Sequence, residues 1–226
     1  MHIHIVAEEH YEEMRGERDS LKKMFKNYRR LSEALKNTGE KMLILAEPYI
    51  EVDHEFAHPR HRIVARLGKL AENATVLPLD NQLLREQNAA QMWMLKDLQE
   101  EKKKMRNKER AVEQIAHVER IKMLEFLETA SARSKTMAKN IVKAIELIKK
   151  YPELQDVKRI VAVVGAEHAP EVAGYLVEML GDRVGEQIYI HGNGAEPSVF
   201  NAKGGVVLHI HDVTAGQKIY RQFLRD

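Results

Sequence analysis

No glycine or proline occurs between Asn81 and Tyr151, and the part of this stretch up to Glu128 is rich in Glu, Lys, Gln, Met and Leu. These residue types favour helix, so the sequence predicts long helix from Asn81 to Glu128. A continuous helix of this length would extend roughly 70 Å at 1.5 Å per residue. Because that exceeds what a compact domain of this size can hold, we expect a bend or hairpin near Met105 to Lys108.

Apolar runs of strand length precede this helical stretch. They cover His2 to Ala7, Met42 to Ala46 and Ala74 to Leu79. Between them, apolar residues at three- and four-residue spacing predict helices at Leu21 to Leu35 and Ile63 to Leu70. Three strand-then-helix units in order imply a parallel sheet with right-handed crossovers.

A second helical stretch, Ser131 to Lys150, has one apolar face, and the pattern then returns to sheet. Further strands are predicted at Arg159 to Val164, Gln187 to His191 and Val206 to His211. Pro170 suits the first turn of a helix running to Leu180, where Gly181 suits the C-terminal cap. The glycine-rich segment Gly192 to Gly205 is interpreted as a loop.

The fold class that follows is α/β, with a mainly parallel central sheet flanked by helices and a long helical insertion at about residues 81–150. We expect a single domain spanning residues 1–226, a length that can bury a sizeable core.

The composition limits the possible partners and sites. The 36 Lys and Arg balance 34 Asp and Glu to a net charge of +2, so no nucleic-acid partner is expected. No cysteine is present, which excludes a thiol nucleophile and thiolate metal sites. The sequence contains no run of about 18 apolar residues, which a membrane-spanning helix would need, and we expect a cytoplasmic protein.

Polar side chains follow four predicted strands at the point where each strand ends. They are His10, Glu47, Asp80 and His168. The carboxyl ends of parallel strands form the crevice where ligands bind in open sheets, so these side chains are expected to converge. Acidic residues also commonly begin loops and cap helices, which is the competing interpretation of Glu47 and Asp80.

Two of these strand ends have the same pattern. Ala7-Glu8-Glu9-His10 and Gly165-Ala166-Glu167-His168 each place a histidine three residues after a small residue that ends an apolar strand. A small residue lets the backbone turn tightly, and an imidazole at the sheet edge can ligate a metal or move a proton.

The paired small-x-x-His motifs resemble those of the TraB, PrgY and TIKI group and its relatives, ChaN and the erythromycin-esterase-like proteins. The segment 132–141, which contains Arg133, followed by the segment 161–168, is similar to the family's Arg-containing helix start and its Gly-x-x-His strand end. The first motif has Ala7 where the family has Gly, and Glu8 falls where the ChaN and esterase relatives carry a Glu. The resemblance extends from His2 to about Gly181 and implies the fold and a site position for Arg133.

Our leading hypothesis is a hydrolase that activates water at the crevice, acting on a small-molecule or peptide substrate. His10 and His168 would be metal ligands, or general base and acid, and Glu8 and Glu47 would hold the metal or orient the histidines. The expected metal ligands are thus His10, Glu47 and His168, with Mn, Zn or Fe as the divalent metal.

Two further residues complete this hypothesis. Asp80 would order the site through the metal ligands. Arg133 would bind a carboxylate or phosphate of the substrate, or stabilise an oxyanion.

The alternative is a non-catalytic ligand-binding or regulatory protein that uses the same pocket for haem or a small effector. The resemblance to ChaN suggests haem. In either hypothesis the helical insertion is a candidate surface for a partner, including a homo-oligomer.

The chain also has two His-x-His pairs, His2 with His4 and His209 with His211. Each pair shares one face of its strand, so two adjacent strands could build a metal site. The competing interpretation is an N-terminal strand at the sheet edge with polar residues on its solvent face. A histidine cluster at His54, His58 and His61 would cover the crevice as a lid, or simply lie at the surface.

Overall fold

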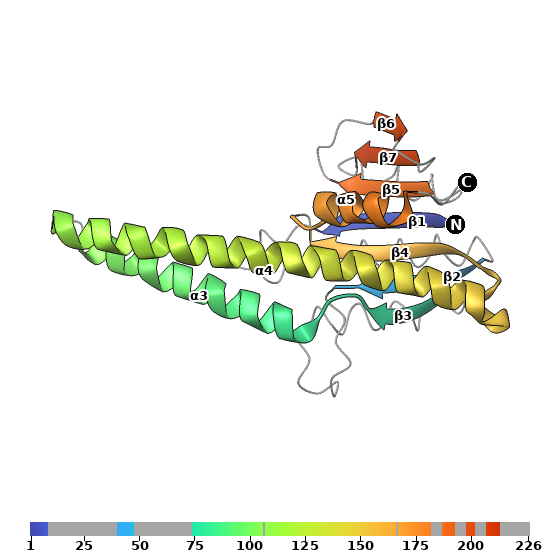
Figure 1. Cartoon of the computed structure of the whole chain (residues 1–226), viewed down its shortest axis with the longest axis horizontal. Helices are drawn as coiled ribbons and strands as arrows, with labels where there is room; N and C mark the ends of the chain where they lie inside the picture. Colours follow the sequence, from blue (N-terminus) through green and yellow to red (C-terminus); the bar gives the residue numbers. More distant parts are fainter. Residues whose placement is uncertain are drawn as a thin grey trace, which may run out of the picture.

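The computed structural model describes residues 1–8, 40–47, 74–105, 107–165, 167–181, 187–192, 198–201 and 207–212. Seven strands form one sheet in the order β3-β2-β4-β1-β5-β7-β6 (Figure 1). The strands are β1 (His2–Glu8), β2 (Lys41–Ala46), β3 (Ala74–Pro78), β4 (Val157–Gly165), β5 (Gln187–Gly192), β6 (Ser198–Asn201) and β7 (Val207–Asp212). All neighbours pair in parallel except β6 with β7. The prediction of a mainly parallel sheet is confirmed.

Helices of the described residues are α3 (Gln82–Lys104), α4 (Glu109–Lys150), the short 3-10 helix η1 (Pro152–Leu154) and α5 (Ala169–Leu180). The C-terminal half of α4 and the whole of α5 cover one face of the sheet (Figure 1). Fully buried isoleucines of α4 and the strands form the core there, among them Ile141, Ile145, Ile5 and Ile160. Both faces of β4 are buried apart from Lys158, as expected for a central parallel strand with a continuous apolar sequence.

The predicted hairpin is present, with its turn at Met105 to Lys108 between α3 and α4. The side chain of Asn81 caps α3 by accepting a hydrogen bond from the Leu84 amide at 3.2 Å. Three lysines in the last turn of α3 interact favourably with the negative end of the helix dipole. Beyond the sheet, α3 and α4 run side by side away from it (Figure 1). We call α3, the turn and α4 as far as Glu128 the arm.

Three features differ from the expectations. First, α4 is one helix of 42 residues and does not divide near Ser131, because nothing between Glu128 and Ser131 breaks a helix. Second, β1 lies at the centre of the sheet between β4 and β5 rather than at its edge. Third, the segment Gly192 to Gly205, interpreted as a loop, contains the short strand β6. Its antiparallel return onto β7 is a non-local pairing that glycine content does not reveal.

The predicted helices at residues 21–35 and 63–70, His10, and the cluster of His54, His58 and His61 lie outside the described residues. Among the helices that the structure does describe, none is both long enough and apolar enough to cross a membrane.

Candidate functional site

The ends of β2, β3 and β4 meet at one edge of the sheet. Glu47 follows β2 directly, and its amide donates to the Val163 carbonyl of β4 at 2.8 Å. Asp80 lies two residues after the end of β3. The amide of Leu79, which stands between them, donates to the Ala46 carbonyl at 3.1 Å. These backbone bonds extend the sheet by one residue past each strand and fix where the two carboxylates begin.

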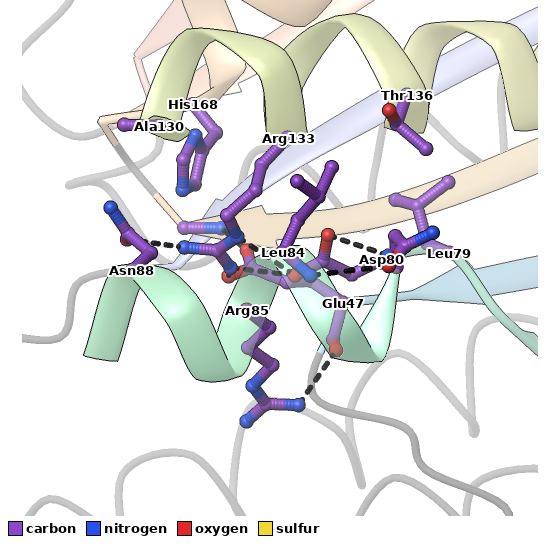
Figure 2. A network of polar contacts seen from close by, with 12 residues as sticks. Glu47, Leu79, Asp80, Leu84, Arg85, Asn88, Ala130, Arg133, Thr136 and His168 are labelled. Atoms are coloured by element: carbon purple, nitrogen blue, oxygen red, sulfur yellow. Dashed lines mark hydrogen bonds and ion pairs between the residues drawn. The ribbon is translucent and has the colours of Figure 1, made fainter. Parts of the chain in front are cut away.

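Arg133 of α4 joins both carboxylates. Its Nη2 donates to Glu47 Oε1 at 2.7 Å and to Asp80 Oδ2 at 2.6 Å, and its Nε donates to the same Asp80 oxygen at 3.0 Å (Figure 2). Nη1 donates to the Oδ1 atom of Asn88 at 2.9 Å. Four of the five guanidinium hydrogens are therefore used inside the cluster.

The cluster of Glu47, Asp80 and Arg133 is buried. The side chains of Arg133, Glu47 and Asp80 are 8%, 7% and 4% exposed. Burial by itself lowers the pKa of Arg133, but the hydrogen bonds and charges of Asp80 and Glu47 outweigh it and raise that pKa. One positive and two negative groups give the cluster a formal charge of −1, so it is a poor place for a further anion.

Each carboxylate has a second partner. Glu47 Oε2 accepts a short hydrogen bond from the amide of Gly165, the last residue of β4. Asp80 Oδ1 accepts from the Asn81 amide at 2.7 Å. Both oxygens of each carboxylate are thus occupied by donors of the protein, and the ends of three strands are held together through side chains.

His168 stands beside this cluster at the start of α5, and its ring lies next to the Arg133 side chain (Figure 2). It is 3% exposed, and its Nδ1 atom is 2.8 Å from the hydroxyl of Ser134. The same hydroxyl donates to the Ala130 carbonyl at 3.2 Å. A hydroxyl has one proton, so both contacts are hydrogen bonds only when Nδ1 of His168 carries hydrogen and donates to Ser134.

This tautomer leaves Nε2 of His168 as the acceptor nitrogen. Within the described part of the chain, the His168 ring forms its hydrogen bond through Nδ1, to Ser134. Burial lowers the pKa of His168, and the nearby charge of Arg133 lowers it further, whereas the charges of Glu47, Glu167 and Asp80 raise it by less. The imidazole is therefore neutral at neutral pH.

The fit of a divalent metal can be tested on these side chains. Across the described residues, no group of three or more His, Asp or Glu side chains is placed to hold an ion. Of the expected ligands, Glu47 and His168 belong to the described residues, and both oxygens of Glu47 are engaged by donors of the protein. These two side chains by themselves do not make a metal site, because zinc takes three or four ligands.

The structure brings Glu47, Asp80, Arg133 and His168 together. His10 lies outside the described residues. The backbone of Glu8 pairs in register with Gly165 at the same edge, and the position of the Glu8 side chain is not among the described features.

Sequence reasoning missed Asn88 and Ser134, the two polar residues that the helices contribute. Asn88 also donates to the Phe126 carbonyl at 3.2 Å, so it ties α3 to α4 as well as to Arg133. Asn88, Gln91 and Leu95 are the buried residues of α3. Their spacing of three and four residues is the sequence signal for one helix face, the face turned toward α4. Ser134 is adjacent to Arg133, but sequence gives no sign that it reaches a histidine 34 residues away.

The His-x-His pairs do not build a site from two adjacent strands, because β5 lies between β1 and β7. The rings of His2, His4 and Tyr189 are stacked instead, with His4 and Tyr189 centroids 4.6 Å apart. His2 Nδ1 is 3.2 Å from the Tyr189 hydroxyl. His4 and Tyr189 of this stack are buried.

Comparison with known proteins finds no matching family model, no matching curated protein and no matching solved structure.

Proposed function

We propose that this edge of the sheet is the working centre of a hydrolase in which Nε2 of His168 takes a proton from the attacking water. The observation that carries the proposal is the state of the imidazole. It is buried and neutral, its Nδ1 is fixed by Ser134, and its acceptor nitrogen is Nε2. A neutral imidazole with an available acceptor is what general base catalysis at neutral pH requires.

In this proposal Glu47, Asp80 and Arg133 are positioning residues. Arg133 has one guanidinium hydrogen left after its bonds to Asp80, Asn88 and Glu47. It therefore lacks the two free N–H groups with which arginine binds a carboxylate or phosphate. The negative charge of Glu47 favours the imidazolium that forms at His168 when water loses its proton.

The charge of the cluster also narrows the substrate class. A formal charge of −1 beside the base repels an anionic reacting group. An uncharged carbonyl compound, an ester or an amide, therefore fits the centre better than a phosphoester does.

The test is a panel of p-nitrophenyl esters, a chromogenic peptide and p-nitrophenyl phosphate, assayed with the wild type, His168→Gln and His117→Gln. We expect hydrolysis of an ester or the peptide, with a loss on the order of 100-fold or more in His168→Gln. His117 is an exposed histidine of the arm, so its replacement should leave the rate unchanged. Equal rates in all three proteins would overturn the proposal.

The same proteins are analysed for Mn, Zn and Fe and for haem absorbance. A divalent metal that is bound by the wild type, required for turnover and lost in His168→Gln would make His168 a ligand and not the base. Haem absorbance without hydrolysis of any substrate would favour the ligand-binding protein.

A further inference from the structure

The strand that separates the two His-x-His pairs carries a histidine of its own. β5 lies between β1 and β7 (Figure 1). In the parallel register of β5 with β7, His191 is the direct partner of His211, and Tyr189 is the direct partner of His209. Three histidines and one tyrosine therefore occupy a block of four positions on two neighbouring strands.

The four positions of this block share one face of the sheet. Ile190 of β5 belongs to the core beneath α4 and α5, so Tyr189 and His191, on either side of it, are on the opposite face. Register partners on neighbouring strands share a face, which places His209 and His211 there as well. This placement comes from the backbone, because the side chains of the three histidines are not among the described features. The absence of an ion-holding group among the described side chains therefore does not extend to them.

The spacing within this block suits a transition-metal ion. Neighbouring strands lie about 4.8 Å apart, and residues i and i+2 of one strand lie about 6.6 Å apart along it. Imidazoles on three such positions can reach a common ion, and three histidines are a donor set that holds zinc in proteins, at zinc–nitrogen distances of about 2.0–2.1 Å. Imidazole suits Zn, Cu and Ni, whereas Mg and Ca take oxygen ligands.

Tyr189, at the fourth position of the block, is committed to groups on the β1 side. Its ring stacks on that of His4 with the centroids 4.6 Å apart. Its hydroxyl donates to the side-chain oxygen of Gln187 and lies 3.2 Å from Nδ1 of His2. The pair His2 and His4 thus belongs to the ring stack, which leads from Tyr189 toward β1 and away from β7.

We propose that His191, His209 and His211 bind one zinc ion on this face of the sheet. The ion would lie apart from the cluster of Glu47, Asp80 and Arg133. His191 is level with Ala46, the residue before Glu47, through the registers of β5 with β1, β1 with β4 and β4 with β2. Three strand spacings separate them, which is roughly 14 Å. The zinc site is therefore additional to the general base proposed at His168.

The first test is calorimetric titration of the full chain with Zn²⁺ after removal of metal by EDTA, with Mg²⁺ as the comparison ion. We expect one Zn²⁺ per chain and no binding of Mg²⁺. His191→Gln and His211→Gln should each weaken zinc binding by more than the roughly 10–100-fold typical of losing an outer partner of a ligand. His117→Gln, an exposed change on the arm, should bind zinc like the wild type. A wild type without zinc binding, or equal affinity in all four proteins, would overturn the proposal.

The second test is thermal unfolding with and without Zn²⁺, followed by circular dichroism. An ion that binds the folded chain raises its melting temperature by mass action. The wild type should gain stability from Zn²⁺, whereas His191→Gln should melt at the same temperature with and without it. A zinc-dependent gain of wild-type size in His191→Gln would contradict the proposal.

The third test needs only the wild type, so it decides even where a variant does not fold. Diethylpyrocarbonate modifies accessible imidazoles, and mass spectrometry locates the modified residues. Zn²⁺ should protect His191, His209 and His211 and leave His117 modified. Protection of other histidines in their place would refute the assignment.

The His168→Gln protein separates this proposal from the proposed hydrolase. It should bind Zn²⁺ with wild-type affinity whether or not the wild type hydrolyses any ester or peptide. Zinc binding that is lost in His168→Gln and kept in His191→Gln would move the ion to the polar cluster and overturn the site on β5 and β7.

Discussion

Arg133 and Asp80 are 53 residues apart in the chain, yet Nε and Nη2 of the guanidinium donate to the same carboxylate oxygen at 3.0 and 2.6 Å. This contact fastens the turn after β3 to the middle of α4. Because Arg133 also bonds to Glu47 after β2, one side chain holds two strand ends and a helix in a fixed relation.

Removing Arg133 should therefore destabilise the fold as well as the site. Arg133→Ala leaves two buried carboxylates without their counter-charge, which typically costs about 3–5 kcal/mol of unfolding free energy. Arg133→Lys keeps the charge but loses the planar fork, so its loss should be smaller. Urea denaturation measures both. Lys139→Ala, an exposed change on the same helix, should stay within about 0.5 kcal/mol of the wild type, and an Arg133→Ala protein as stable as that control would contradict the expectation.

The lowered pKa of His168 predicts a pH dependence of stability. Burial, the main cause, disfavours the charged imidazole in the folded state, so between the folded-state pKa and the ordinary value of 6.5 the unfolded chain binds more protons. The contribution is fully present above about pH 6.5 and is lost as the pH falls toward the folded-state pKa. Urea denaturation of the wild type and His168→Gln at several pH values isolates it. The unfolding free energy of the wild type should fall more steeply below pH 6.5, and parallel curves would count against this account.

Ser134 should set the tautomer of His168. In the wild type, nitrogen-15 NMR of the imidazole should show hydrogen on Nδ1, because Ser134 accepts from it. Ser134→Ala removes the acceptor, so the population with hydrogen on Nε2 should rise. Ser131→Ala is the matched control one turn earlier, because Ser131 bonds to Tyr175 at 2.9 Å and not to His168. The same spectrum in the Ser134→Ala and wild-type proteins would show that another contact sets the tautomer.

Gln91 offers a stabilising change. It is 8% exposed, and its Oε1 atom has no hydrogen-bond partner among the described residues. Gln91→Leu removes a buried acceptor that lacks a partner and adds apolar contact to the seam of the arm, so the unfolding free energy should rise by about 1 kcal/mol. Gln99→Leu, an exposed change that gives up a hydrogen bond to Glu119, should give no such gain. A thermal or urea melt decides, and a less stable Gln91→Leu protein would refute the expectation.

The sequence predicted the parts of this fold that depend on local pattern. Apolar runs gave the cores of β2, β3 and β4, and the absence of Gly and Pro gave the helices with their turn at Met105 to Lys108. The order of the strands, with β1 at the centre, depends on non-local pairing, which the pattern of one strand does not contain.

The grouping of these polar side chains was predictable to a similar extent. Glu47, Asp80 and His168 were expected to converge because strand ends share an edge, and Arg133 was added to them on the ground of a resemblance. Asn88 and Ser134 were missed because helical spacing gives the face of a helix but not the partner opposite it. The pairing of Arg133 with two carboxylates, instead of with an anionic ligand, depends on distances that sequence spacing does not give.

The unbroken course of α4 has a consequence for how the arm and the polar cluster are connected. Glu128, where the arm ends, and Arg133 belong to the same helix. Because no loop separates them, a displacement at the base of the arm would act directly on the helix that carries Arg133, and through its hydrogen bonds on Glu47 and Asp80.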